Sequence, residues 1–364
     1  MKIQEVIQLI EDLAPLSYQE SYDNSGLIVG NYKDDVTGVL ICLDSTEEVV
    51  DEAIANNCNL IIAHHPILFS GLKKLNGNNY IERTILKAIK NDIAIYAAHT
   101  NLDNANGGVN YKIAEKIGLT NCKPLVSKKG LLNKLVVFCP VNYANEVRNA
   151  MFENGAGAIG DYKECSFNTK GEGTFKSLSG AKPFVGNKNE SHTESEIKIE
   201  VIVESHLLSG VLSAMFTSHP YEEVAYDLLK LENRLETVGS GLIGELDEEI
   251  DEITFLKNVK VDLKTDCIRH TNLLNKKIKK VALCGGSGSF LLPEAIRVDA
   301  DIFITGDFKY HQFFDAENKI IIADIGHYES EQFTKELIYD ILIKKITNFA
   351  VRLSEINTNP INYL

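Results

Sequence analysis

The chain has 364 residues, and its 37 Lys and Arg against 51 Asp and Glu give a formal net charge of −14. Hydrophobic residues make up 44% and charged residues 24% of the sequence, which excludes a largely disordered or fibrous protein. The acidic excess argues against a broad surface for nucleic acid or anionic membranes, because both require clustered positive charge.

The first residues and the cysteines indicate the compartment. Residues 1–16 mix acidic with apolar residues and predict an amphipathic helix rather than a signal peptide. No segment has the ~20 consecutive apolar residues that cross a bilayer. The seven cysteines are scattered and lack a C-x-x-C pair, which favours reduced thiols over a disulfide framework. We therefore expect a cytoplasmic protein that binds no membrane.

Residues 1–125 alternate short apolar segments with amphipathic ones. Strands are expected at 36–44, 59–65 and 93–100, and helices at 45–57, 80–92 and 109–119. Strand–helix–strand repeats at this spacing are typical of a parallel sheet with helices on its faces.

Residues 126–240 have a different character. A strand at 133–141 and a helix at 144–157 are followed by a Gly-, Lys- and Asn-rich stretch that predicts loops and hairpins. A further strand is expected at 195–205, and then a helix and turn at 207–229. Within that last segment HPYEE (219–223) is interpreted as a helix start, because proline suits the first helical position and acids suit the N-terminal dipole. This order resembles a ferredoxin-type split βαβ unit.

Alternating α/β character returns in residues 241–364. Strands are expected at 279–288, 300–307 and 319–327, and a last helix at 330–346. The predicted architecture is an α/β domain, with a mixed or parallel sheet and flanking helices, formed by residues 1–125 and 241–364. An inserted ferredoxin-like α+β domain at 126–240 interrupts it.

Histidines and carboxylates follow several of these predicted strands. His64 and His65 come directly after one apolar strand, and His99 and Asp103 lie just beyond another. Open α/β sheets place their ligands at the carboxyl ends of strands, and the Asp103 carboxylate could bridge two cations. Each pair alone is equally compatible with an ordinary polar turn. His99 is interpreted as a group that contacts substrate rather than as a metal ligand.

A third pair follows the strand at 319–327. His327 and Glu331 are four residues apart, so a helical turn would place both side chains on one face. An exposed helix start is the alternative. Three such clusters at the ends of three strands, all expected in one sheet, would supply enough ligands for two divalent cations with open positions for water.

Other motifs have a structural and a functional interpretation. Glu20, Asp23 and Asn24 could line a metal cavity or form a turn, and CGGSGS (284–289) could cradle phosphate or form a tight turn. Asp307 and His311, beyond the strand at 300–307, could hold substrate or shuttle a proton. The candidate catalytic residues are therefore His99, Asp307 and His311.

Several of these motifs together resemble the GTP cyclohydrolase 1 type 2 homologues, a widespread dinuclear-metal family. The resemblance covers nearly the whole chain. It is carried by YDNSGLIVG (22–30), LIIAHHPILF (60–69), HTNLD (99–103), GSGS (286–289), TGDFKYH (305–311) and GHYESE (326–331), and in the insertion by GAIGDYKECSF (157–167), GEGTF (171–175), KPFVG (182–186) and HPYEEVAYD (219–227).

The resemblance implies a metal site, an assembly and an inserted domain. The implied ligands of two divalent cations (zinc, iron or manganese) are His64, His65, Asp103, His327 and Glu331. The family forms toroidal homohexamers, and its insertion resembles a small PII- or CutA-like domain.

Two functions remain open on the sequence. The first is a metal-dependent hydrolase of a small nucleotide-like or phosphate-bearing substrate, in which two cations activate water. The second is a non-enzymatic metal-binding, metal-delivery or regulatory protein. Multiple turnovers with retained metal would indicate the enzyme, and metal exchange without turnover would indicate the carrier.

Overall fold

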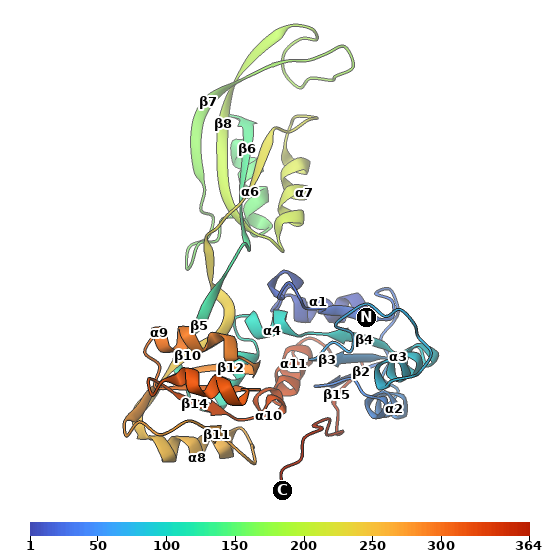
Figure 1. The fold of residues 1–364 in the computed structure, drawn as a ribbon. Coiled ribbons are helices and arrows are strands. Elements are labelled where there is room, and N and C mark those ends of the chain that lie inside the picture. Colours follow the sequence, from blue (N-terminus) through green and yellow to red (C-terminus); the bar gives the residue numbers. More distant parts are fainter. The chain divides into compact units, whose positions relative to one another are not determined.

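The computed structural model describes residues 1–364, which divide into two compact units. Unit 1 comprises Met1–Ser127 and Glu236–Leu364, and unit 2 comprises Lys128–Leu235 (Figure 1). The chain leaves unit 1 through β5 (Thr120–Lys129) and returns through β10 (Arg234–Asp251). None of the helices combines the length and the apolar character that spanning a membrane requires.

The first sheet of unit 1 has the strand order β1-β4-β3-β2-β15. Its strands are β1 (Gly26–Val29), β2 (Gly38–Cys42), β3 (Leu60–Ala63), β4 (Ala94–Ala97) and β15 (Ala350–Leu353). All neighbours are parallel except β1, which runs antiparallel to β4. Every residue of β2, β3 and β4 is buried, as expected for parallel strands with both faces covered.

Helices cover this sheet, and side chains fix where two of them begin. The helices are α1 (Ile3–Glu11), α2 (Glu47–Ala55) and α3 (Tyr80–Lys90). The Thr46 side chain accepts a hydrogen bond from the first turn of α2, and the Asn79 side chain does the same for α3. Such caps satisfy backbone N–H groups that have no partner inside the helix.

The second sheet of unit 1 has the order β11-β14-β13-β12-β10-β5. Its remaining strands are β11 (Arg269–His270), β12 (Lys277–Ser287), β13 (Ile302–Gly306) and β14 (Ile321–Asp324). The strands β12, β13 and β14 are parallel, whereas β10 and β11 pair antiparallel with β12 and β14. The other helices of unit 1 are α4 (Thr100–Asn104), α5 (Val109–Lys116), α8 (Glu252–Asp262), α9 (Leu292–Arg297), α10 (His327–Glu331) and α11 (Thr334–Ile343).

The mixed α/β fold class is confirmed, but the expectation of one sheet carrying all three His–carboxylate clusters is wrong. Two clusters follow β3 and β4 of the first sheet, and the third follows β14 of the second. A hydrophobic run predicts that a strand is buried but not which strand lies beside it. The antiparallel β10 lies between β12 and the edge strand β5, so β12 has no strand of the first sheet beside it.

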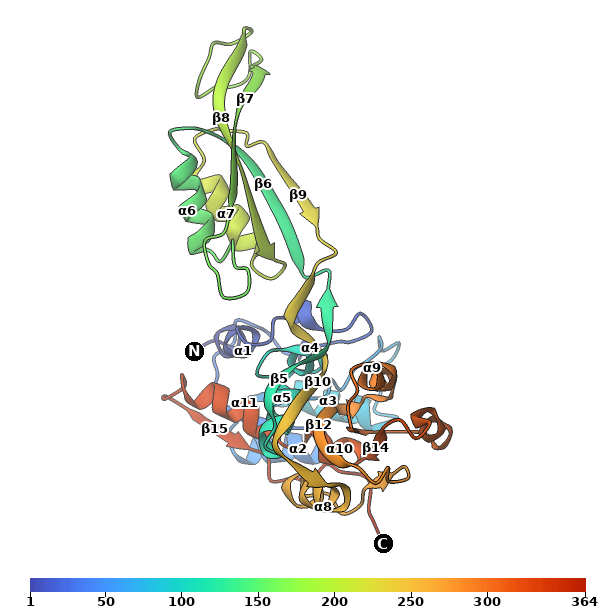
Figure 2. The ribbon, with the colours of Figure 1, turned by 90° about the vertical axis from the view of Figure 1, so that its left-hand side faces the viewer.

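Unit 2 contains an antiparallel sheet with the order β7-β8-β6-β9. Its elements are β6 (Leu132–Pro140), α6 (Ala144–Glu153), β7 (Phe167–Lys176), β8 (Ser191–Glu204), α7 (Leu208–Ser218) and β9 (Tyr226–Lys230). Figure 2 shows α6 and α7 on the same side of this sheet, where their apolar residues and those of β6 and β8 form one core. This βαββαβ order with all strands antiparallel is a ferredoxin-like arrangement.

One expectation in unit 2 is wrong, because HPYEE (219–223) follows a helix instead of starting one. The helix α7 ends at Ser218, and His219 has an extended backbone with ψ of 133°. A residue before proline avoids helical geometry, and Pro220 cannot continue a helix. The segment therefore forms the turn before β9, a strand that the sequence pattern did not predict.

Candidate metal centre

Two sheets bring the predicted ligands of unit 1 together. His64 and His65 follow the last residue of β3, and Asp103 lies in α4, just beyond β4. His327 and Glu331 are the first and last residues of α10, which follows β14 of the other sheet. The five side chains therefore meet between the carboxyl ends of strands, where α/β sheets place their ligands.

These side chains form two groups with potential ligand atoms within 4.8 Å of one another. One group consists of His64, Asp103 and Glu331, and the other of His65, His327 and Glu331. The Glu331 carboxylate belongs to both groups, whereas Asp103, which the sequence suggested as a bridge, belongs to one.

The distances show how Glu331 joins the two groups. Its Oε2 lies 2.9 Å from Nε2 of His65 and 3.2 Å from Nε2 of His327. Its Oε1 lies 3.6 Å from Nε2 of His64, and that nitrogen is also 3.6 Å from Oδ1 of Asp103. Each group thus presents imidazole nitrogen and carboxylate oxygen, a donor set that suits zinc, iron or manganese.

Each of the three histidines is oriented through its other ring nitrogen. The Nδ1 atom of His65 lies 2.8 Å from Oδ1 of Asp44, and that of His327 lies 2.7 Å from Oδ2 of Asp307. The Nδ1 atom of His64 lies 2.8 Å from the carbonyl oxygen of Ala98. With Nδ1–H donated outward, each Nε2 lone pair faces the cluster, which is the usual arrangement around metal-ligating histidines.

Two buried atoms in the cluster have no hydrogen-bond partner. They are Nε2 of the fully buried His64 and Oδ1 of Asp103. Burying such acceptors without a donor is costly, and nearly all buried polar groups in folded proteins are paired. A divalent cation between them would satisfy both atoms, so the residues present fit a metal ion.

The charges of the cluster depend strongly on one another. Burial raises the pKa of Asp103, and the nearby Glu331 carboxylate raises it further. Burial also disfavours a charged Glu331, but the imidazoles of His64, His327 and His65 outweigh it and hold the pKa well below its usual range. Without metal, therefore, bound protons and imidazolium groups balance the negative charge of the buried carboxylates. A cation that binds must displace these protons.

Three backbone amides of the glycine segment 284–289, at the end of β12, donate to other parts of unit 1. The N–H of Gly285 donates to Oδ1 of Asn110, and the N–H of Gly286 donates to Oγ of Ser330. The N–H of Gly288 donates to Oγ1 of Thr305. Because these three amides already donate within the protein, they are not free to bind phosphate, which favours the tight-turn interpretation of CGGSGS.

His99 lies at the edge of the cluster and is oriented by Asp23. One ring nitrogen of His99 that could bind metal lies within 4.8 Å of the corresponding nitrogens of His64 and His65. Its Nδ1 lies 2.7 Å from Oδ1 of Asp23. The fully buried Asp23 side chain also accepts hydrogen bonds from the backbone and hydroxyl of Thr100. Its role is thus to hold His99 rather than to line the cluster.

The other two residues of that predicted motif make structural contacts. The Glu20 carboxylate accepts from Nδ2 of Asn104 at 2.8 Å, and Nδ2 of Asn24 donates to the carbonyl oxygen of Leu68. The turn interpretation of ESYDNSG therefore fits these two side chains better than the metal-cavity interpretation.

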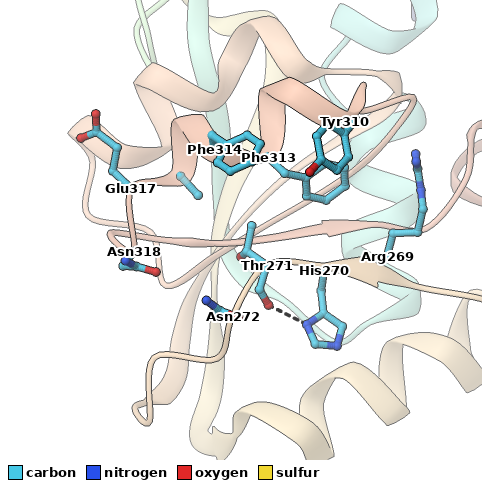
Figure 3. A pocket seen from close by; sticks show the side chains of 10 residues that line it. Arg269, His270, Thr271, Asn272, Tyr310, Phe313, Phe314, Glu317 and Asn318 are labelled. Carbon is cyan, nitrogen blue, oxygen red and sulfur yellow. Dashed lines mark hydrogen bonds between the residues drawn. The ribbon is translucent and has the colours of Figure 1, made fainter.

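The other two predicted catalytic candidates, Asp307 and His311, lie at different distances from the cluster. Asp307 contacts His327, but His311 is exposed and its ring contacts those of Tyr310 and Phe314. Tyr310 lines a pocket of about 570 Å³ between the 3-10 helix Tyr310–Ala316 and β11 (Figure 3). Arg269, on the rim of this pocket, pairs with Asp324 of β14, whose other oxygen accepts the N–H of Gly326.

Asp44 is a site residue that the sequence reasoning missed. It follows β2, the parallel neighbour of β3, so the rule that selected His64 and His65 would also have selected it. Its Oδ2 accepts a hydrogen bond from Oγ1 of Thr358 at 2.6 Å. No sequence signal marks Thr358, because the segment after β15 lacks regular structure.

Fold and site together define a mixed α/β protein with a buried His–carboxylate cluster that could hold metal. The Duf34/NIF3 (NGG1p interacting factor 3) family matches residues 1–360, and the chain belongs to this family. Two relatives are each described as a GTP cyclohydrolase 1 type 2 homolog. The one from Halalkalibacterium halodurans is 41% identical over 99% of this chain and 98% of its own. The one from Bacillus subtilis is 39% identical over the same shares.

Solved structures agree with the fold along the whole chain. A Bacillus cereus protein related to NIF3 is 40% identical, with a TM-score of 0.86 over 100% of this chain and 99% of that chain. A Staphylococcus aureus protein is 31% identical, with a TM-score of 0.78 over the same shares. The expected family is therefore confirmed.

Proposed function

We propose that this chain is a hydrolase that uses two divalent cations (zinc, iron or manganese) and acts on a small nucleotide-like or phosphate-bearing substrate. The observation that carries the proposal is the paired arrangement of Nε2 atoms and carboxylates around Glu331, with two buried acceptors left without donors. The name GTP cyclohydrolase 1 type 2 homolog, given to relatives at 39% and 41% identity, supports a nucleotide-like substrate.

The proposed ligands divide between the two groups. His64 and Asp103 would hold one cation, His65 and His327 would hold the other, and Glu331 would contact both. When bound, a pair of cations activates water as a nucleophile and polarises the group under attack. Asp44 and Asp307 would fix the orientation of the imidazoles and raise their basicity as ligands.

His99 is the best-placed residue for proton transfer. Asp23 accepts from its Nδ1, so its Nε2 is left on the side of His64 and His65. A histidine held in one tautomer beside the reacting groups can take up or deliver a proton at Nε2. In this proposal His99 acts as acid or base, and Asp23 positions it.

We also propose that the chain assembles into a homohexamer, as the family resemblance implies. Light scattering of the full-length protein tests this directly. A mass corresponding to one or two chains at working concentration would contradict it.

The catalytic proposal is tested by measuring metal and turnover together. Protein purified without chelators should contain metal by elemental analysis and should hydrolyse GTP or a phosphoester many times per site while retaining that metal. Glu331→Gln should lose both properties, and Glu317→Gln, which removes an exposed carboxylate, should keep both. Metal that exchanges readily, with no turnover on any substrate, would instead favour the metal-delivery function.

A further inference from the structure

Unit 2 contains a pocket of about 800 Å³ that the metal chemistry does not use. It lies along β7 and β8 and is bordered by residues 177–184 and by the turn before β9. Three aromatic side chains in its lining, Phe175, Phe184 and Tyr221, are close to one another, with ring centroids 6.2 to 6.3 Å apart in two pairs. Cavities of this size with apolar walls and few polar groups are typical of small-molecule sites.

The pocket contains one buried carboxylate, that of Glu196. This residue is only 9% exposed, and its Oε1 accepts a hydrogen bond of 3.0 Å from the hydroxyl of Tyr221. Burial and the adjacent carboxylate raise the pKa of Tyr221, so its hydroxyl remains a donor. No hydrogen bond or ion pair of Oε2 is found in the structure, and this atom lies over the backbone of Gly173.

The neighbouring lysines do not neutralise Glu196. Lys198 lies on the same face of β8, two residues further on, but its ammonium group pairs with Glu200. Lys170 is directly opposite Ile197, which packs against the helix-covered core, so Lys170 is on the other face of the sheet. Lysines are present in the lining, but none of them forms an ion pair with Glu196. The buried carboxylate therefore lacks a cationic partner, which favours a positively charged occupant.

The β7 backbone beside Glu196 is uncovered at Gly171. Gly171 is the register partner of Glu196 on β7, and a Cβ atom built on Gly171 meets nothing within 4 Å. A planar group could therefore lie against the β7 backbone, with its charged end at Glu196 and its rings beside Phe175 and Tyr221. Aromatic faces attract cations, and a carboxylate forms short, strong hydrogen bonds with charged N–H donors.

We propose that this pocket binds a small organic cation that joins an N–H-bearing amidinium, guanidinium or ammonium group to a planar apolar body. The site lies wholly in unit 2 and does not depend on the function proposed for the metal cluster. Its specificity comes from Glu196, which requires a donor, and from the aromatic walls, which exclude strongly hydrated ions.

The probe is benzamidine, and benzamide serves as its neutral analogue. Ligand-observed NMR titrations of the full-length protein should give a dissociation constant of about 1 mM or tighter for benzamidine. Benzamide should bind at least about tenfold more weakly, because it lacks the charge that pairs with Glu196. Glu196→Gln should weaken benzamidine binding by a similar factor.

Two further variants separate the pocket from unspecific effects. Glu153→Gln removes an exposed carboxylate at the end of α6, which does not line the pocket, and should leave the dissociation constant within about twofold. Gly171→Phe should fill the cavity and abolish binding while circular dichroism shows an unchanged fold, since space is open at that Cβ. This variant keeps the test decisive if Glu196→Gln does not fold.

Three results would overturn the proposal. The first is no binding of benzamidine at about 10 mM. The second is equal binding of benzamide, or equal losses in Glu196→Gln and Glu153→Gln, because either would mean that Glu196 recognises nothing. The third combines two observations: benzamidine does not bind to the wild type, and Gly171→Phe has a different mass from the wild type in light scattering. Together they would make the pocket an interface between copies of the chain.

Discussion

A Cβ atom on Gly286 would lie 2.4 Å from Oε1 of Glu331, the carboxylate shared by both groups of the metal centre. Nonbonded carbon and oxygen atoms do not approach so closely, so any side chain at this position must displace the carboxylate. Gly286 also has φ of +61°, a conformation that L-residues adopt only at a cost. The glycine segment at the end of β12 is therefore shaped around Glu331.

Gly286→Ala should weaken metal binding more than it weakens the fold. Displacement of Glu331 removes an oxygen from both groups, so we expect the metal affinity to fall at least about tenfold. The left-handed backbone should cost about 1 kcal/mol in the free energy of unfolding. Competition with a chelator and urea unfolding of the metal-free protein measure the two effects separately.

Gly118→Ala is the matched control for this substitution. Gly118 has φ of +71°, and a Cβ built there meets nothing within 4 Å. It should lose similar stability and keep its metal affinity. Equal metal affinity in both variants would show that Gly286 does not govern the position of Glu331.

Asp44 and Asp307 should affect the metal affinity although neither is a proposed metal ligand. Asp44→Asn and Asp307→Asn keep the size of each side chain but weaken the acceptor for Nδ1 of His65 or His327. We expect each to lower metal affinity by about 10- to 100-fold, as is typical for partners of metal-ligating histidines. Asp340→Asn, which changes an exposed residue of α11, should have no effect. Unchanged affinity in both test variants would mean that the imidazoles need no such support.

The sequence predicted the local elements, and the closeness of the proposed ligands, better than the arrangement of the sheets. The buried runs of β2, β3, β4, β13 and β14 were all recognised, because a parallel strand covered on both faces is a continuous apolar segment. The edge strands β1, β11 and β15 were missed, because none of them is buried along its whole length and none therefore has to be a continuous apolar run. The pairing of two sheets was missed because strand order depends on contacts remote in sequence.

In the site, too, local relations could be predicted from the sequence and tertiary relations could not. His327 and Glu331 were paired correctly by their helical spacing, which is a local relation. That Glu331 rather than Asp103 joins the two groups depends on the approach of α10 to β3 and α4, a tertiary relation that no spacing records. His311 was selected by its place after β13, but the turn points it toward Tyr310 and Phe314 instead.

Asp23→Asn should destabilise the metal-free protein in a pH-dependent way. Burial alone would raise the pKa of Asp23, but the hydrogen bond and charge of His99, together with Thr100 and Ser25, hold it well below its usual value. A carboxyl group whose pKa is depressed by folding stabilises the fold above its unfolded pKa of about 4. This contribution is lost as the pH falls from about 4 toward the folded pKa.

The expected difference in the free energy of unfolding between wild type and Asp23→Asn is therefore about 2 kcal/mol at pH 7 and smaller at pH 3. Urea titrations at both pH values measure it. A difference that stays constant between the two pH values would show that the ionised carboxylate is not what stabilises this turn.

Excision of unit 2 should leave a folded metal-binding unit 1. All five proposed ligands lie in Met1–Ser127 and Glu236–Leu364, so a short linker from Ser127 to Glu236 should retain metal stoichiometry. A cut at residue 245 would instead remove Leu242, Ile243 and Gly244, which pair with β12. Circular dichroism and elemental analysis test the shortened chain. Failure to fold, or loss of metal, would contradict an independent inserted domain in residues 128–235.

Asp103→Asn and Glu331→Gln should differ in how many metal ions they lose. Asp103 belongs only to the group with His64, whereas Glu331 belongs to both groups. We therefore expect Asp103→Asn to lower the metal content from about two ions per chain toward about one, and Glu331→Gln to lower it toward zero. A second reason is electrostatic, since two adjacent dications repel each other and a shared carboxylate offsets that repulsion.

Turnover gives an independent measure of the same difference. If both cations act on one water molecule, Asp103→Asn should reduce hydrolysis of GTP or a phosphoester by at least about 100-fold, or ~2.7 kcal/mol at the transition state. Full metal content in Asp103→Asn would show that Asp103 is not a ligand. Turnover that persists at the wild-type rate with one ion lost would assign catalysis to the His65–His327 group alone. Because Glu331→Gln removes a ligand from that group as well, it should still abolish turnover in that case.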